Sequence, residues 1–232
     1  MKELNNFFKE LEKRGIHASE SQKKIIENKV YSVLNYEPII GLFGKRWVGK
    51  SSLCNTLFGQ DTCKISNVAA CTRNPQEALL GMEGKGLKLI DIPGVGENVK
   101  RDEEYYKLYN KLLPELDLVL WVLKADDRAF SSDEKCYKEI IKPHIEEGKV
   151  FFFVLNQVDK IAPFREWDLN KREPGPNQLQ NMYRKVTHLS NIFGISKSKI
   201  ISVSAEEKYN ITKLFDEIVF ALPKEKKITL FK

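Results

Sequence analysis

The chain has 232 residues, of which 42% are hydrophobic and 30% are charged, so it can bury a core and is not a disordered chain. No apolar run reaches the roughly 18 residues of a membrane-spanning helix, and the first residues lack the apolar centre of a signal peptide. We therefore expect no transmembrane segment and a cytoplasmic protein. Four scattered cysteines predict reduced thiols, and a net charge of +6 from interleaved acids and bases names no partner.

The first 36 residues predict a helical extension. Apolar residues recur there at the spacing of one helix face, and a second helix begins near Ser19, beyond Gly15. This extension precedes a change of pattern at Pro38, after which short apolar runs alternate with helical segments.

The alternating part predicts an α/β fold of three layers, a mostly parallel sheet flanked by helices. Continuous apolar runs indicate strands that are covered on both faces. Residues 77–82 predict an added antiparallel strand that turns at 84–86, and residues 161–177 predict a surface insertion. The predicted strands are 38–44, 87–91, 118–123, 150–155 and 199–203, and the predicted helices are 50–59, 101–113, 131–147, 176–192 and 210–221. The expected organisation is an extension (1–36), one catalytic domain (37–222) and a tail (223–232).

Residues 44–51 read G-K-R-W-V-G-K-S, which fits the phosphate-binding pattern G-x-x-x-x-G-K-[S/T] between a predicted strand and a predicted helix. Glycines let amide groups point at phosphate oxygens, and the helix that starts near Lys50 adds its dipole. We expect Lys50 to neutralise the β- and γ-phosphates and Ser51 to bind Mg²⁺. The alternative, a glycine turn with an exposed lysine, does not explain this context. The predicted nucleotide-binding residues here are Gly44, Lys45, Arg46, Trp47, Val48, Gly49, Lys50, Ser51 and Ser52.

Three later segments bear on the choice between ATP and GTP. Residues 91–94 read D-I-P-G, where Asp91 can reach a metal ion through water and the Gly94 amide can meet the γ-phosphate. Residues 156–159 read N-Q-V-D, where the Asp159 carboxylate can accept both the N1–H and the 2-amino hydrogens of guanine. A backbone amide of residues 204–205 (S-A) can bind guanine O6. The predicted base-binding residues are Asn156, Gln157, Asp159, Ser204 and Ala205.

The order of these segments is more informative than any one of them. A turn after a strand explains D-x-x-G alone about as well. All four segments, however, follow predicted strands, and doubly wound sheets bind ligands at the carboxyl ends of their strands.

With these motifs the chain resembles the translation-factor-like GTPases of the Era, TrmE, EngA and septin group. The resemblance is strongest to the prophage-associated YfjP-like GTPases, whose domain family is named for binding the 50S ribosome. Residues 49–55, 68–73, 91–94 and 155–161 carry it. The resemblance implies a P-loop G domain, GTP and GDP as ligands, and Mg²⁺ as cofactor. It also implies that Thr72, in a Thr-Arg pair of the first switch, faces Mg²⁺ and the γ-phosphate. The implied catalytic set is Lys50, Thr72 and Gly94, and the implied metal set is Ser51, Thr72 and Asp91.

Three positions depart from the family pattern. Gln157 replaces the usual lysine of the base motif, and Trp47 stands where some relatives have an asparagine that helps to hold potassium. Val95 stands where Ras-like enzymes have a glutamine that orients water. We therefore expect a slowly hydrolysing GTP switch.

Two alternatives remain, namely a GTP-dependent dimerisation or assembly module with incidental turnover and, less favoured, a P-loop ATPase. A nucleotide-dependent homodimer stays open as a partner, and a ribosome or RNA partner depends on the family name alone.

Overall fold

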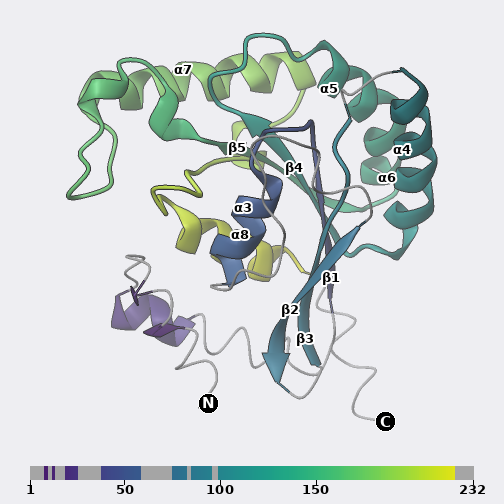
Figure 1. Cartoon of the computed structure of the whole chain (residues 1–232), viewed down its shortest axis with the longest axis horizontal. Coiled ribbons are helices and arrows are strands. Elements are labelled where there is room, and N and C mark those ends of the chain that lie inside the picture. The colour runs from purple at the N-terminus through teal and green to yellow at the C-terminus, as the bar shows by residue number, and fades with distance from the viewer. Residues whose placement is uncertain are drawn as a thin grey trace.

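The computed structural model describes residues 8–9, 12–13, 19–25, 38–58, 75–82, 85–95 and 99–222. Within these residues, six strands form one sheet in the order β2-β3-β1-β4-β5-β6 (Figure 1). Neighbouring strands are parallel except β2, which is antiparallel to β3. This confirms the predicted mostly parallel sheet with one added antiparallel strand. The strands are β1 (Ile39–Phe43), β2 (Gln76–Met82), β3 (Lys85–Asp91), β4 (Leu118–Lys124), β5 (Val150–Asn156) and β6 (Ile200–Ser202).

Helices cover both faces of the sheet and make the three predicted layers. α3 and α8 pack on one face, where their apolar side chains share a core with β1, β4 and β5. α4, α5 and α7 pack on the other face (Figure 1). The helices are α3 (Lys50–Phe58), α4 (Val99–Leu112), α5 (Ser131–Cys136), α6 (Lys142–Glu146), α7 (Pro176–Phe193) and α8 (Ile211–Ala221). Within the described residues, no helix combines the length and the apolar character that crossing a bilayer requires.

The described part of the N-terminal extension agrees with the predicted helices. Residues 8–9, 12–13 and 20–25 are helical, and Phe8 is buried. Ile25, an apolar residue of the second predicted helix, is 47% exposed. The remainder of the extension, including Gly15, lies outside the described residues.

The aromatic residues of β4 and β5 belong to the core, in agreement with the predicted strands that are covered on both faces. Along β5, Phe152 faces α3 and α8, whereas Phe151 and Phe153 face the other helical layer, because successive side chains of a strand point to opposite faces. Trp121 of β4 is fully buried and stacks against Phe43 at 6.2 Å between ring centroids. The rings of Phe43 and Trp121 belong to the core on one face of the sheet, and Phe43 directly precedes the loop that follows β1.

Two details of the predicted elements were wrong. The hairpin does not turn at 84–86, because Lys85 and Gly86 already pair with β2 as the first residues of β3. The single helix expected at 131–147 is instead α5, a wider π-helical turn at Tyr137–Ile141, and α6. Pro143 follows this turn and has no N–H to donate, so regular α-helical hydrogen bonding does not continue through it.

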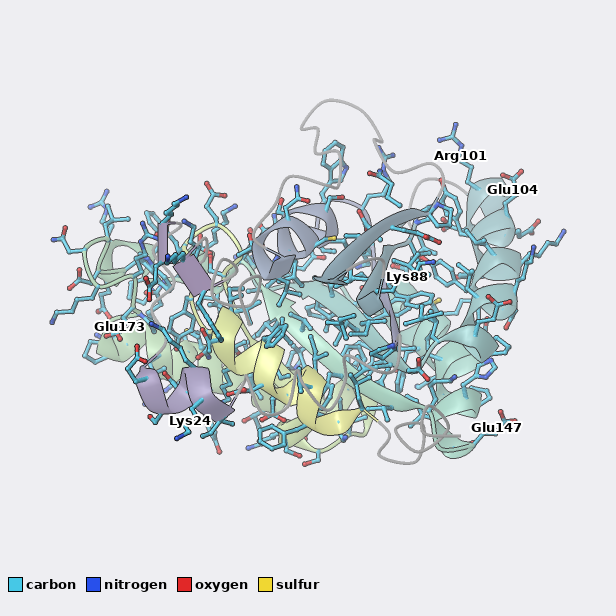
Figure 2. The ribbon with its side chains drawn as sticks, turned by 90° about the horizontal axis from the view of Figure 1, so that it is seen from below. Lys24, Lys88, Arg101, Glu104, Glu147 and Glu173 are labelled. Carbon is cyan, nitrogen blue, oxygen red and sulfur yellow. The ribbon has the colours of Figure 1, made fainter. Side chains whose placement is uncertain are left out.

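The predicted insertion between β5 and α7 is present as a compact surface segment. It contains a short 3₁₀ turn at Phe164–Glu166 and an isolated bridge between Asp168 and Glu173. Figure 2 shows Glu173 at one end of the molecule, and Glu104 of α4 and Glu147 after α6 at the other. The insertion therefore lies at the opposite end of the molecule from α4 and α6.

Candidate functional site

Four loops meet at the carboxyl ends of the parallel strands. They follow β1, β3, β5 and β6, and β1 lies beside β3 and β4 at the centre of the sheet. In sheets of this kind ligands bind at this edge. These loops, the strand ends that precede them and the start of α3 carry all predicted site residues that the structure describes, which are Gly44, Lys45, Arg46, Trp47, Val48, Gly49, Lys50, Ser51, Ser52, Asp91, Gly94, Asn156, Gln157, Asp159, Ser204 and Ala205. Thr72 lies outside the described residues.

The loop after β1 requires glycine at Gly44 and at Gly49. Gly44 has φ +130° and Gly49 has φ +88°, a region that other residues rarely adopt. A Cβ atom on Gly49 would stand 2.5 Å from Nδ2 of Asn156, and one on Gly44 would stand 2.3 Å from the carbonyl oxygen of Val122. The loop therefore lies directly against the neighbouring strand ends.

Lys50 places a buried cation at the centre of this loop. Its side chain lies almost wholly inside the protein, and Nζ donates to the carbonyl oxygens of Gly44 at 3.2 Å and Lys45 at 2.8 Å. Burial lowers the pKa of Lys50 to about 8, against the opposing attraction of Asp91 and Asp133. An anion bound here would restore the charge that burial disfavours.

Ser51 and Asp91 come together beside this cation. The Ser51 hydroxyl donates to Oδ2 of Asp91 at 2.5 Å, and Asp91 is fully buried at the end of β3. Hydroxyl and carboxylate oxygens are the kind of ligand that Mg²⁺ prefers, either directly or through water. The chemistry of these two side chains therefore fits the predicted metal site.

The segment after Asp91 packs on the phosphate-binding loop. A Cβ atom on Gly94 would stand 2.6 Å from Nζ of Lys50 and 2.8 Å from the backbone nitrogen of Arg46. The Arg46 amide donates to the carbonyl oxygen of Val95 at 3.2 Å. The Val95 side chain is fully buried, so it belongs to the core and not to the solvent side of the site.

Lys45 turns its side chain away from the loop, toward α5. Its ammonium pairs with Oδ2 of Asp133 at 2.7 Å and donates to the carbonyl oxygen of Ala129 at 2.7 Å. Trp121 Nε1 donates to the other Asp133 oxygen at 3.0 Å. Burial raises the pKa of Asp133, and the hydrogen bond from Lys45 opposes that shift. Asp133 is not predictable from the sequence, because no motif marks a carboxylate 88 residues after its lysine.

Trp47 is the exposed residue of the loop. Half of its surface is accessible, its φ is +66°, and the Arg46 guanidinium lies 5.2 Å from its ring centroid. An arginine over an indole ring is a favourable cation–π contact. The two side chains form a surface beside the buried Lys50.

Asn156 links three loops with one side-chain amide. It is almost fully buried, Nδ2 donates to the carbonyl oxygen of Val48 at 2.9 Å, and Oδ1 accepts from the Ala205 amide at 3.0 Å. The Ala205 carbonyl in turn accepts from the Thr56 hydroxyl at 3.2 Å. The loops after β1, β5 and β6 are therefore held in one fixed arrangement.

The rest of the N-Q-V-D segment adjoins the phosphate-binding loop. Gln157 has φ +63°, and its Nε2 donates to the carbonyl oxygen of Trp47 at 3.2 Å. Lys160 donates to Gln157 Oε1 at 3.2 Å. Among the described residues, Oδ1 of Asp159 is a buried carboxylate oxygen without a hydrogen-bond partner. Such an oxygen is suited to accept hydrogen bonds from a ligand.

Gln178 on α7 is a further residue that the motifs do not include, and its fully buried side chain contacts the backbone of this segment. A single glutamine at the start of an amphipathic helix carries no motif, so the sequence holds no signal for it.

The comparisons with known proteins agree with this geometry. A family model described as 50S ribosome-binding GTPase matches residues 39–157. YkfA of Escherichia coli K12 is 40% identical over 201 residues, which cover 85% of this chain and 66% of YkfA. YfjP of the same organism is 37% identical over 200 residues, which cover 86% of this chain and 67% of YfjP. The chain thus spans about two thirds of the length of these relatives.

A solved structure gives the same result. A variant of Era from Aquifex aeolicus, bound to GDP and AlF₄⁻, superposes with a TM-score of 0.62 and 25% sequence identity over 80% of this chain and 56% of that chain. The predicted family resemblance and fold class are confirmed. The chain belongs to the 50S ribosome-binding GTPase family and is a P-loop GTPase.

Proposed function

We propose that the chain binds GTP or GDP with Mg²⁺ across the four loops, hydrolyses GTP slowly, and acts as a nucleotide-dependent switch. The observation that carries the proposal is the pair of hydrogen bonds that the Asn156 side chain makes. These two hydrogen bonds hold the phosphate-binding loop and the Ser204–Ala205 segment together, so one ligand can contact both.

Each loop has a role in this proposal. Lys50 and the backbone amides of residues 44–52 bind the phosphates, and Gly94 meets the γ-phosphate. Ser51, Asp91 and Thr72 hold Mg²⁺, which neutralises phosphate charge when bound. The base is bound by Asn156, Gln157, Asp159, Ser204 and Ala205, with the Asp159 carboxylate selecting guanine. We place this G domain at residues 37–222 and propose a cytoplasmic location.

Slow hydrolysis is proposed from the position of Val95. In the reaction, a water oxygen forms a bond to the γ-phosphorus, the bond to the β–γ bridging oxygen breaks, and GDP takes that electron pair. Phosphoryl transfer needs a group that orients this water. Val95 has no polar atom and is buried in the core, so the isolated chain would leave the water poorly positioned.

The alternative function is a GTP-dependent assembly module with incidental turnover. The observation in its favour is Trp47, whose half-exposed indole and the Arg46 guanidinium flank the phosphate-binding loop. A second copy of the chain covering this face would bury the indole and could sense the bound nucleotide. A ribosome or RNA partner has the family description as its support.

Two measurements test these proposals. Competition of GTP, GDP and ATP against a fluorescent guanine nucleotide should show displacement by the guanine nucleotides alone, whereas equal displacement by ATP would favour the ATPase alternative. Light scattering with GDP and with a non-hydrolysable GTP analogue separates a monomeric switch from an assembly module. A mass that doubles with the analogue would favour assembly.

A further inference from the structure

The fully buried side chain of Gln178 holds the backbone of the segment that carries Asp159. Its Nε2 donates two hydrogen bonds, both of 2.9 Å, to the carbonyl oxygens of Asp159 and Ile161. Two acceptors fix which end of the amide is the nitrogen. The contact joins the start of α7 to the turn at residues 158–160.

The insertion places this glutamine by capping the helix on which it stands. The Glu166 carboxylate accepts from the backbone amides of Asn177 at 3.0 Å and Gln178 at 3.2 Å, and from Asn177 Nδ2 at 2.7 Å. These are amide groups that an α-helix leaves unpaired at its first turn. Asn181, one turn along α7, adds a 2.9 Å hydrogen bond from its Nδ2 to the carbonyl oxygen of Ala162. Three side-chain hydrogen bonds therefore run from α7 to residues 159–162.

The same insertion also contacts the second base-recognition loop. Trp167 is largely buried and packs edge-on against Tyr209, with ring centroids 5.5 Å apart. Tyr209 exchanges backbone hydrogen bonds of 3.0 and 3.2 Å with Ser204, which directly precedes Ala205. The insertion thus supports both segments that would surround a guanine base.

Burying Gln178 carries a cost that packing alone does not explain. Its Oε1 is buried without a hydrogen-bond partner among the described residues, and an unpaired buried polar atom is destabilising. An apolar side chain of similar size would avoid that cost but would leave the carbonyl oxygens of Asp159 and Ile161 without this donor. The amide therefore serves to hold the backbone carbonyl groups of Asp159 and Ile161 in place.

We propose that Gln178 is a positioning residue for guanine recognition, which fixes the Asp159 carboxylate by holding the backbone carbonyl groups of Asp159 itself and of Ile161. The insertion, of which residues 161–175 precede α7, holds α7 and the Ser204–Ala205 segment in fixed positions relative to Asp159. This proposal rests on the proposed function, because it assigns Asp159 to the guanine N1–H and 2-amino groups.

The test compares GTP with ITP, whose base lacks the 2-amino group. In the parent chain Asp159 accepts two hydrogen bonds from GTP and one from ITP, so GTP should bind more tightly. Gln178→Met keeps the side-chain length but removes the amide. We expect this variant to weaken GTP binding about tenfold, which corresponds to the loss of one hydrogen bond to a charged group, and to weaken ITP binding much less. The ratio of the ITP and GTP dissociation constants should fall toward one.

The matched control is Gln180→Met, which makes the same change on the exposed side of the same helix. It should leave both affinities unchanged. If Gln178→Met does not fold, Asn181→Ala removes the outer hydrogen bond to Ala162 and should lower the same ratio by about twofold. In an Asp159→Asn background, Gln178→Met should change the ratio no further, because coupled residues are not additive.

The outcomes separate two failures. A parent chain that does not bind GTP would overturn the proposed function. A parent chain that binds GTP through Asp159, with an ITP/GTP ratio that stays the same in folded Gln178→Met or Asn181→Ala, would overturn this inference alone.

Discussion

The hydroxyl of Tyr109 donates a 2.6 Å hydrogen bond to the carbonyl oxygen of Pro93, and the whole Tyr109 side chain is buried. Burial raises the pKa of Tyr109 well above its usual value, so the hydroxyl keeps its proton at neutral pH. The bond connects α4 to the segment between Asp91 and Gly94. The segment after Asp91 is thus held by α4 through Tyr109 and by the phosphate-binding loop through the Arg46 amide.

Tyr109→Phe should loosen this connection and preserve the aromatic packing. The ring would still meet Phe43 edge-on, at the present 4.7 Å between centroids, but the buried Pro93 carbonyl would lose its donor. We expect a loss of about 1–2 kcal/mol in the free energy of unfolding, measured by urea denaturation. An unchanged midpoint and slope would contradict this role, and Tyr183→Phe, an exposed tyrosine of α7, serves as the control.

Asp159→Asn should change base preference. The mutant amide can donate to the 2-oxo group of xanthine but no longer accepts both guanine donors. The affinity for XTP should therefore rise and the affinity for GTP should fall. We expect GTP to weaken by about 3 kcal/mol, because buried polar groups lose their partners. Competition binding with GTP and XTP measures the change. A mutant that binds GTP as well as the parent would show that the base site is assigned to the wrong residue.

The sequence predicts the elements well because hydrophobic pattern and loop chemistry are local signals. The strands at residues 118–123 and 150–155 are continuous apolar runs, and both are strands of the sheet. The boundaries that were wrong depend on context. Lys85 and Gly86 pair with β2 although glycine is typical of turns, and the π turn at Tyr137–Ile141 interrupts a segment whose pattern is helical throughout.

The candidate site likewise has a part that the sequence predicts and a part that depends on the fold. The motifs locate the loops, since each motif is a run of a few residues after a strand. The sequence does not reveal side chains that connect loops across the fold, such as Asp133 to Lys45 or Gln178 to Asp159. Those contacts depend on how α5 and α7 sit on the sheet, and a single sequence contains no pattern that pairs them.

Nucleotide affinity should fall with rising pH because of Lys50. Burial lowers the pKa of Lys50 to about 8 in the chain without nucleotide, so the ammonium is charged below that pH and increasingly neutral above it. A bound triphosphate favours the charged form and raises the pKa again, so binding takes up a proton above pH 8. The GTP dissociation constant should rise about fourfold between pH 7 and pH 8.5. Lys50→Met should bind weakly with no such dependence, and an equally steep rise in that variant would exclude Lys50 as the cause.

Lys50→Ala and Ser51→Ala should weaken nucleotide binding in different ways. Removing Lys50 deletes the buried cation, so triphosphate binding should weaken at every Mg²⁺ concentration. Removing Ser51 deletes the hydroxyl that lies 2.5 Å from Asp91, so more Mg²⁺ should be needed for tight binding while saturating Mg²⁺ restores much of it. Titrations of nucleotide affinity against Mg²⁺ distinguish the two. Superimposable titrations for Ser51→Ala and the parent would remove Ser51 from the metal site.

Hydrolysis by the dilute chain should be slow and should accelerate when a partner covers Trp47. An unassisted site of the Ras type turns over at roughly 3–5 × 10⁻⁴ s⁻¹, and the buried Val95 offers nothing better. If a second chain covers the half-exposed Trp47 face, activity per chain should rise with protein concentration, and Trp47→Ala should reduce that rise without abolishing GTP binding. The control is Phe164→Ala, which removes an exposed aromatic residue of the insertion, away from the phosphate-binding loop. Turnover of about 1 s⁻¹ or faster by a verified monomer would contradict the account, because it would require a water-orienting group that Val95 does not supply.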